Sequence, residues 1–320
     1  MLKLAQVIYA NKFLPTPLPP PGTFAGRTIL LTGGTSGLGL ATAVHFLNLS
    51  ASKVIITART TSKGSIAKAS IESQIQLPES EAGVVEVRIL DMGTFAGIKR
   101  FADELQREVE RVDYVLLNAG IVARGFRVSE EGFEESLAVN CLGTALLGIL
   151  LLPWLKVAGR GRGHLGVVTS GVHRGVDINK LPQKDLFAFY SKEENWPTGS
   201  PNIVQVIVNP MCPGMVKSDL GRDYKTNFLM SIGVDTFMTL AAKSTEFGAV
   251  RLVVPAMTTK EENGKYISNS QSNEEYLKVV QKNVLGPEGQ KMQKRVWEEV
   301  LSILEQRVPE VRKIMTASAV

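Results

Sequence analysis

Short apolar runs alternate along the chain with longer windows in which apolar positions recur at helical spacing. The first apolar run opens the stretch 27–39, and later ones lie at 53–58, 84–91, 113–119, 165–170 and 203–209. Helical windows lie between them at 36–49, 65–76, 95–111 and 130–157. Because strands that alternate with helices are joined by right-handed crossovers, the pattern predicts an α/β fold with a parallel, doubly wound sheet.

The two ends of the chain follow other patterns. Residues 1–26 combine a short apolar patch with a cluster of prolines, which predicts an arm and a stiff linker. We expect one domain over 27–270 and a helical extension over 271–320. Within these parts, the pattern indicates a helix at 235–247, a last strand at 265–268 and a terminal helix at 289–307.

The stretch 137–155 is apolar enough to be compared with a membrane span. It contains Asn140 and Pro153 and follows a segment rich in glutamate, which favours a helix buried in the domain over one that crosses a membrane. The sequence thus predicts no membrane span.

Composition narrows the class of protein further. The chain has 320 residues, 44% of them hydrophobic and 21% charged, enough for a large globular core. Its net charge of +5 comes from scattered basic residues, so we expect no nucleic-acid partner. Cys141 and Cys212 lack metal-ligand spacing, and the three histidines form no metal pattern, which indicates a reducing compartment and a cytoplasmic protein.

A glycine-rich turn follows the first predicted strand. Gly33, Gly37 and Gly39 stand where a side chain would block the turn, the approach of a pyrophosphate or the packing of the next helix. The helix at 36–49 would direct its N-terminal amides at that phosphate. The turn therefore predicts a dinucleotide site that includes Thr35, Ser36 and Leu38; the alternative is an ordinary strand-to-helix turn.

The ends of the second and third strands bear on the choice of cofactor. Where an acidic residue would bind the ribose hydroxyls of NAD, the chain has Arg59, which suits the 2′-phosphate of NADP. A solvated arginine at a strand end is the alternative. Asp91 could accept a hydrogen bond from the adenine amino group, or cap the helix whose window starts near Thr94.

These residues, with others in order along 27–219, resemble the short-chain dehydrogenase/reductase family. The matching positions are Thr32-Gly33-x-x-x-Gly37-x-Gly39, Asp91, Asn118-Ala119-Gly120, Asn140, Ser170 and Pro213-Gly214. The resemblance implies a Rossmann-type fold, NADP(H) or NAD(H), and hydride transfer between the nicotinamide and a carbonyl or alcohol. The Trp297 helix and the stretch 264–268 further resemble fungal members that tailor secondary metabolites.

The resemblance also implies roles for single residues. Asn118, Ala119 and Gly120 would line the cofactor, and Pro213, Gly214 and Val216 would border the nicotinamide. Ser170 would polarise the substrate carbonyl. Asn140 would belong to a proton relay, with a hydrogen-bonded core amide as the alternative.

One motif of that family is not intact. The family uses a Tyr and a Lys four residues later, on one face of the helix after the fifth strand. Here Tyr190 is followed by Lys192 at the second position and by Glu194 at the fourth, where a carboxylate would raise the phenol pKa. Tyr190 is nevertheless the nearby phenol able to serve as the acid, and Lys192 the nearby cation; both could instead be exposed loop residues.

Two alignments of this region remain open. In one, Ser191-Lys192 matches the family, and Ala188 stands in place of the tyrosine. In the other, Tyr190 belongs to a loop, and the catalytic helix is missing between Gly199 and Ile203. The second leaves 184–196 as the crossover helix. In the family the missing helix builds the dimer interface, which counts against the homodimer that the resemblance implies.

Two functions follow from these observations. The first is an NADP-dependent oxidoreductase that acts on CH–OH or C=O groups of a small, secondary-metabolite substrate. The second is a catalytically impaired NADP-binding relative that serves as a partner or sensor, or an incomplete isoform.

Overall fold

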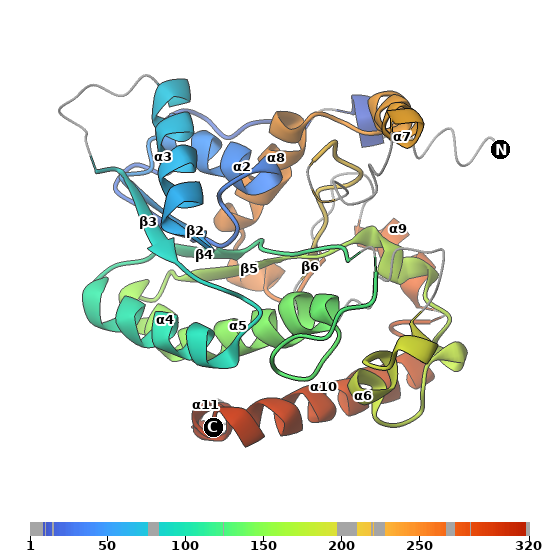
Figure 1. Ribbon diagram of the computed structural model, residues 1–320. Coiled ribbons are helices and arrows are strands. Elements are labelled where there is room, and N and C mark those ends of the chain that lie inside the picture. Colours follow the sequence, from blue (N-terminus) through green and yellow to red (C-terminus); the bar gives the residue numbers. More distant parts are fainter. Residues whose placement is uncertain are drawn as a thin grey trace.

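Six parallel strands form one sheet in the computed structural model (Figure 1). The structure describes residues 9, 11–14, 16–75, 83–123, 125–196, 210–218, 220, 228–266, 273–281 and 283–317. In these residues the sheet has the order β3-β2-β1-β4-β5-β6. The strands are β1 (Thr28–Leu31), β2 (Lys53–Ala58), β3 (Val85–Ile89), β4 (Tyr114–Leu117), β5 (His164–Val168) and β6 (Pro210–Met211).

This sheet confirms the predicted fold class. The strand order reverses between β1 and β4, which makes that edge the switch point at which doubly wound folds bind ligands. The predicted ranges overlap β1 to β5, and most of them extend slightly beyond the observed ends. The predicted strand at 203–209 lies outside the described residues, which resume at Pro210 in β6.

Helices cover both faces of the sheet (Figure 1). One face carries α2 (Gly37–Asn48), α3 (Thr61–Ile75) and α8 (Thr245–Val253); the other carries α4 (Phe95–Glu108), α5 (Thr144–Ala158), α10 (Pro287–Arg307) and α11 (Glu310–Ala317). Side chains of β1 alternate between two cores: Ile29 and Leu31 belong to the first, and Leu30 to the second. Because successive side chains of a strand point to opposite faces of the sheet, one short strand contributes to both cores.

The long apolar stretch is a core helix. It begins as a π-helical segment, η2 (Leu137–Gly143), and continues as α5. Among the described residues, Leu137–Ala158 is the one helix long and apolar enough to cross a membrane, but 67% of its most apolar window is buried inside the fold. It packs beneath the sheet against α4 and α11 (Figure 1).

The prediction of one crossover helix at 184–196 is wrong. After β5 the chain forms short 3-10 segments, then α6 (Leu186–Tyr190) and the 3-10 turn Glu193–Asn195. The hydroxyl of Ser191 ends α6 because it donates to the Phe187 carbonyl at 2.7 Å and accepts the Glu134 amide at 2.9 Å. A side chain that bonds the preceding turn and a remote amide stops the helix after little more than one turn.

Two predictions in the C-terminal half also need correction. The helix expected at 235–247 is two helices, α7 (Phe228–Ala241) and α8, because Lys243 bridges to Val216 between them and Ser244 caps α8 through the Phe247 amide at 3.2 Å. Of the strand expected at 265–268, Lys265 and Tyr266 are not in a strand, and the rest lies outside the described residues. The terminal helix at 289–307 is α10, and α9 (Asn273–Val280) precedes it.

Candidate functional site

The glycine-rich turn after β1 needs its glycines for steric reasons. Gly33 and Gly37 have positive φ angles of 69° and 52°, a conformation that other residues rarely adopt. A Cβ at Gly39 would lie 2.1 Å from the Gly33 carbonyl oxygen. A Cβ at Gly33 would lie 2.9 Å from the Cα of Ala119. The turn is thus packed directly against the segment that follows β4.

The N-terminus of α2 opens onto this turn. Ser36 precedes the helix and makes no side-chain capping bond, and the first helical turn carries no acidic residue. The first turn of α2 therefore supplies no negative charge of its own to the positive end of the helix dipole. Thr35, Ser36 and Leu38 lie at this end of α2, and Ser36 is exposed. A helix N-terminus of this kind can hold a phosphate.

The segment 118–121 is fixed beside the turn by two side chains. Thr32 is fully buried, and its hydroxyl accepts the amides of Asn118 at 2.9 Å and Ala119 at 3.0 Å. The Asn118 side chain donates to the Thr32 carbonyl at 3.0 Å. These bonds join the carboxyl ends of β1 and β4 and leave Gly120 exposed.

Asn140 holds the same segment from below. Its Oδ1 accepts the Ile121 amide at 2.8 Å, and its Nδ2 donates to the Ile121 carbonyl at 2.7 Å. The residue lies in η2, where the π-helical backbone presents it to the loop. Both the oxygen and the nitrogen of the Asn140 side chain are thus bonded to Ile121. Asn140 therefore positions the segment 118–121, which matches the alternative of a hydrogen-bonded amide.

Two further predicted residues lie on the same edge of the sheet. Arg59 follows β2 and is exposed. Asp91 lies two residues after β3, is exposed, and its Oδ1 accepts the Gly93 amide at 2.9 Å. Since Thr94 is the residue that precedes α4, Asp91 is not the cap of that helix. Both side chains are therefore available at the edge where the glycine-rich turn lies.

Ser170 follows β5 and is held through its backbone. Its carbonyl accepts a bond from His173 Nδ1 at 2.6 Å, and His173 Nε2 lies 3.0 Å from the Tyr276 hydroxyl. A carbonyl can only accept, so Nδ1 carries the proton and Nε2 accepts from the tyrosine. Burial is the main reason that the pKa of His173 is lowered, which keeps the ring neutral. Sequence reasoning missed His173 and Tyr276, because α9 approaches β5 only in the folded chain.

The turn after β6 completes this side of the site. Gly214 has a positive φ of 81°, and a Cβ there would lie 2.1 Å from Oδ1 of Asn11. The Pro213 carbonyl accepts a bond from Arg251 at 3.2 Å. Val216 is buried, and a Cβ at Gly248 would lie 2.5 Å from Val216 and 3.1 Å from Leu38. The missing side chain of Gly248 thus lets Val216 reach the first turn of α2.

Tyr190 and Lys192 lie at the end of α6, where they differ in exposure. Tyr190 is half-buried and packs against the core beneath the sheet and edge-on to Phe189. Burial raises the pKa of its phenol, so the cause is desolvation and not the carboxylate of Glu194. Lys192 is exposed, and its backbone begins the next 3-10 turn.

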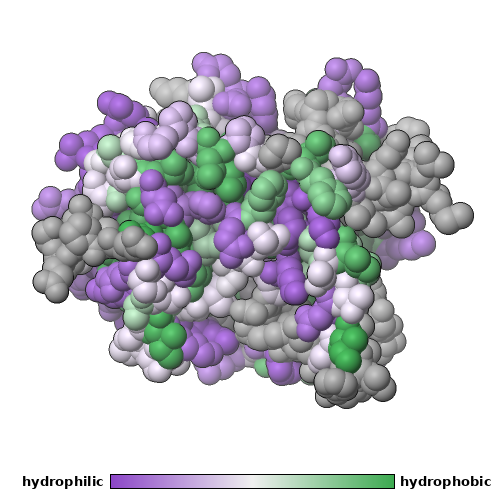
Figure 2. Space-filling view, turned by 90° about the horizontal axis from the view of Figure 1, so that it is seen from above, coloured by the Kyte–Doolittle hydropathy of each residue, from purple (hydrophilic) through white to green (hydrophobic). Residues whose placement is uncertain are grey.

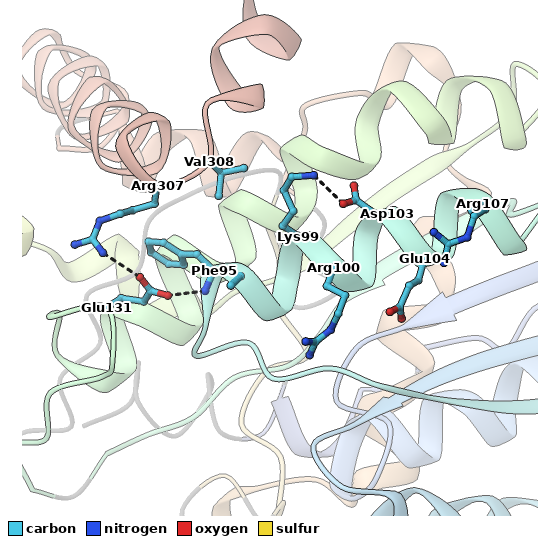
Figure 3. A pocket seen from close by; sticks show the side chains of 10 residues that line it. Phe95, Lys99, Arg100, Asp103, Glu104, Arg107, Glu131, Arg307 and Val308 are labelled. Carbon is cyan, nitrogen blue, oxygen red and sulfur yellow. Dashed lines mark hydrogen bonds and ion pairs between the residues drawn. The ribbon is translucent and has the colours of Figure 1, made fainter.

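A separate groove lies on the outer face of α4. It encloses about 610 Å³ and is lined by residues that include Lys99, Arg100, Asp103, Glu131 and Arg307 (Figure 3). Lys99 pairs with Asp103 at 2.7 Å, and Arg307 with Glu131 at 3.6 Å. The groove joins α4 to the end of α10 and does not include the glycine-rich turn. No group of metal-ligating side chains is found within the described ranges.

Comparisons with known proteins agree with this geometry. A family model described as short chain dehydrogenase matches residues 27–175. The short-chain dehydrogenase/reductase ffsI of Aspergillus flavipes is 33% identical, over 95% of this chain and 93% of that protein. The short-chain dehydrogenase/reductase phmF of Phaeosphaeria nodorum is also 33% identical, over 92% of this chain and 91% of that protein.

Solved structures show a similar fold. The crystal structure of levodione reductase is 18% identical and superimposes with a TM-score of 0.51 over 75% of this chain and 93% of that chain. A Pseudomonas syringae protein assigned as a short chain dehydrogenase is 22% identical, with a TM-score of 0.54 over 80% of this chain and all of that chain.

Proposed function

Because the chain belongs to the short-chain dehydrogenase/reductase family, we propose that it is an NADP(H)-dependent oxidoreductase. When bound, the nicotinamide supplies or accepts the hydride that converts a carbonyl to an alcohol or the reverse. The substrate we propose is a small molecule of fungal secondary metabolism, in line with the fungal relatives. We further propose that the protein works in the cytoplasm, in keeping with its two free cysteines.

The geometry of the glycine-rich turn supports the binding part of this proposal. Gly33 and Gly39 leave no room for other side chains, Gly37 has a positive φ, and the first turn of α2 has no acidic residue to compete with a phosphate. The segment 118–120, fixed by Thr32 and Asn140, would line the cofactor. Asp91 would accept a hydrogen bond from the adenine amino group. The nicotinamide would be bordered by Pro213, Gly214 and Val216. The residues present therefore fit a dinucleotide.

The proposed preference for NADP(H) over NAD(H) rests on Arg59. It is exposed directly after β2, at the edge where the second ribose of a dinucleotide would lie, and no carboxylate occupies that position. A guanidinium can bind a 2′-phosphate through two parallel hydrogen bonds. The same position would repel that phosphate if it held a glutamate.

The first prediction tests this choice. NADPH and NADH are titrated separately against the full chain, with quenching of the fluorescence of its three tryptophans as the signal. We expect NADPH to bind more tightly, and Arg59→Glu to weaken NADPH binding roughly ten- to hundredfold, because a charge-assisted bond contributes about 1.5–3 kcal/mol. NADH binding should not weaken, since a carboxylate at this position can accept bonds from the ribose hydroxyls.

Arg100→Glu is the matched control, since Arg100 is an exposed arginine in the groove on α4. It should leave both affinities unchanged. Equal affinity for the two nucleotides in the unmodified chain, with no effect of Arg59→Glu, would contradict the choice of NADP(H).

The catalytic part is proposed for Ser170 and Tyr190. Ser170 would polarise the carbonyl, Tyr190 would donate the proton to the developing alkoxide, and Lys192 would be the nearby cation. The observation in favour of Ser170 is its fixed place after β5, where His173 holds its backbone. Asn140 would then act on the site by positioning the neighbouring segment.

A catalytically impaired relative is the second candidate function. Burial raises the pKa of Tyr190, which makes its phenol a weaker acid, and no lysine stands four residues later. A general acid works best with a pKa near the operating pH. The features around α6 thus favour a chain that binds the cofactor and turns over slowly or not at all.

The second prediction separates these candidates. A panel of carbonyl substrates is assayed with NADPH for the unmodified chain and for Tyr190→Phe, with NADPH binding measured in parallel. For an enzyme that uses Tyr190, the variant should lose roughly a hundredfold or more in kcat while it retains NADPH binding. Binding without turnover of any carbonyl would support the impaired relative, and equal rates in both proteins would remove Tyr190 from the mechanism.

A further inference from the structure

Two polar residues of the N-terminal arm are buried beside the turn that follows β6. Asn11 is 8% exposed and Thr16 is 6% exposed, although asparagine and threonine are mostly found at protein surfaces. Both precede residues 27–175, the part of the chain that the family model matches. The family resemblance therefore gives the arm no role, and the contacts of these two side chains must explain their burial.

Asn11 bonds the turn much as a neighbouring strand would. Its Nδ2 donates to the Met215 carbonyl at 3.0 Å, and its Oδ1 accepts from the Met215 amide at 3.1 Å. An asparagine amide that pairs with both backbone groups of one residue fixes the orientation of that backbone as well as its position. Gly214 makes this approach possible, because a Cβ there would lie 2.1 Å from Asn11 Oδ1.

Arg251 of α8 joins the other end of the turn to the arm. The residue is 4% exposed. Its Nη1 donates to the Pro213 carbonyl at 3.2 Å, and its Nε donates to the Thr16 hydroxyl at 3.3 Å. A buried guanidinium needs acceptors, and the turn and the arm supply these two. The arm thus contacts the turn directly at Met215 and through Arg251 at Pro213.

The arm is in turn fixed by the end of α7. Lys12 Nζ donates to the carbonyls of Thr239 and Leu240, the latter at 3.0 Å. The last carbonyls of a helix have no donors within the helix and lie at the negative end of its dipole, so an ammonium group is favourable there. The arm is therefore attached at a second place, independent of its bonds to the turn.

The turn that the arm contacts lies beside the glycine-rich turn. Val216 is buried, and a Cβ on Gly248 would lie 2.5 Å from Val216 and 3.1 Å from Leu38. Val216 and Leu38, in the first turn of α2, are therefore close neighbours. A shift of residues 213–216 would move Val216 relative to the helix N-terminus that is proposed to hold the phosphate.

We propose that the N-terminal arm positions the turn 213–216 for the dinucleotide, with Asn11 as the positioning residue that acts through Met215. This inference rests on the proposed function, in which the turn borders the nicotinamide. Without the Asn11 bonds, the turn would spend part of its time in other conformations. The apparent affinity for a ligand falls in proportion to the fraction of the protein that is in the binding conformation.

The third prediction tests this role with Asn11→Ala in the full chain. Hydrogen exchange without nucleotide should be roughly tenfold faster in the peptide that contains Met215, because its amide loses the acceptor on Asn11. NADPH, titrated by tryptophan fluorescence, should bind roughly tenfold more weakly, since two hydrogen bonds that hold the turn are lost.

Control variants separate this effect from a general loss of stability. Asn48→Ala is the matched control, because Asn48 is exposed at the C-terminal end of α2, and it should change neither measurement. Lys12→Met removes the bonds to α7 but keeps those to the turn, so it should weaken NADPH binding far less than Asn11→Ala does. Circular dichroism verifies that each variant is folded.

A milder variant serves if Asn11→Ala does not fold. Thr16→Val keeps the shape of the side chain and removes the hydroxyl that accepts from Arg251. It should weaken NADPH binding by a smaller factor than Asn11→Ala. An unchanged affinity in Thr16→Val would then count against the proposal.

Three results with Asn11→Ala and Lys12→Met would overturn the proposal. They are an unchanged exchange rate at Met215 in folded Asn11→Ala, an unchanged affinity of that variant for NADPH, and equal weakening by Lys12→Met. An unmodified chain that binds no NADPH would instead contradict the proposed function, and the role of the arm in cofactor binding would fail with it. Because exchange is measured without nucleotide, this failure is distinct from failure of the arm to hold the turn.

Discussion

At the scale of single residues, buried or half-buried polar side chains decide how the candidate site is held. Thr32, Asn140 and His173 each bond a backbone group at the carboxyl edge of the sheet. Asn140 was expected from the sequence, but His173 was not, since a lone histidine carries no motif. What distinguishes His173 is its environment, which joins the Ser170 carbonyl to Tyr276 of α9.

The fourth prediction follows from the lowered pKa of His173. Its ordinary value is 6.5, and burial lowers it in the folded chain. As the pH falls below 6.5, the unfolded chain takes up the proton first, so the free energy of unfolding decreases until the folded pKa is reached. Above 6.5 this contribution is fully present.

His173→Gln removes this proton uptake. Glutamine can still donate to the Ser170 carbonyl, so the variant should fold and should lose less stability in acid than the unmodified chain. Urea unfolding at pH values on both sides of 6.5 measures the effect. His45→Gln, on α2, is the control and should keep the full acid-dependent loss. A parallel pH dependence in His173→Gln and the unmodified chain would remove His173 as its source.

At the scale of secondary-structure elements, two helices are capped by residues from distant parts of the chain. The Phe95 amide at the start of α4 donates to Glu131 at 2.7 Å (Figure 3). The amides of Leu186 and Phe187 at the start of α6 donate to the two oxygens of Glu299 at 3.0 and 2.8 Å. A carboxylate there also interacts favourably with the positive end of the helix dipole. Local sequence therefore does not fix where these helices begin.

The fifth prediction concerns α6. Asp185 precedes the helix with a φ of 52° and makes no side-chain cap, so Glu299 supplies the cap instead. Glu299→Ala should lower the free energy of unfolding by about 1–2 kcal/mol and should speed amide exchange across α6. Urea unfolding and hydrogen exchange measure the two effects.

Glu298→Ala is the control on the same helix. The Glu298 side chain is 63% exposed and lies 4.0 Å from Lys294, so its loss should change stability by less than about 0.5 kcal/mol. If both variants lose the same stability, the loss belongs to α10 and not to the cap of α6.

At the scale of the whole molecule, segments distant in sequence close around the sheet. α10 and α11 cover α4 and α5, with Val300, Leu304, Val308 and Val311 in the same core as Leu146. On the opposite side, the Asn11 side chain from the N-terminal arm donates to the Met215 carbonyl at 3.0 Å and accepts from the Met215 amide at 3.1 Å. Seen from above, apolar side chains reach the surface in several separate places among polar ones (Figure 2).

The packing of α10 and α11 changes what is expected of the face beneath the sheet. The resemblance implied a dimer interface built by a long helix after β5, and the described chain has only the short α6 there. Within one chain, α11 instead packs against α5, and α10 adds Val300 and Leu304 to the core beneath the sheet. This packing provides the apolar cover that a longer helix was expected to give.

The sequence by itself determined the sheet, the glycine-rich turn after β1 and the order of the elements. The reason is that these features follow local rules. Strands have a two-residue period and helices have helical spacing. Glycines are needed where a Cβ would collide with neighbouring backbone atoms, as at Gly33 and Gly39. It also located Arg59, Asp91 and Ser170, since the ends of parallel strands meet at one edge.

The tertiary structure alone decided the rest. The end of α6 at Ser191, the cap from Glu299, the bond from His173 to Tyr276 and the bond from Arg251 to the Pro213 carbonyl all join residues far apart in sequence. No spacing along the chain encodes such contacts, because they form only when separate elements pack together. The same holds for the pKa of Tyr190. From the sequence, the carboxylate of Glu194 was expected to raise it, whereas in the folded chain burial of the phenol raises it.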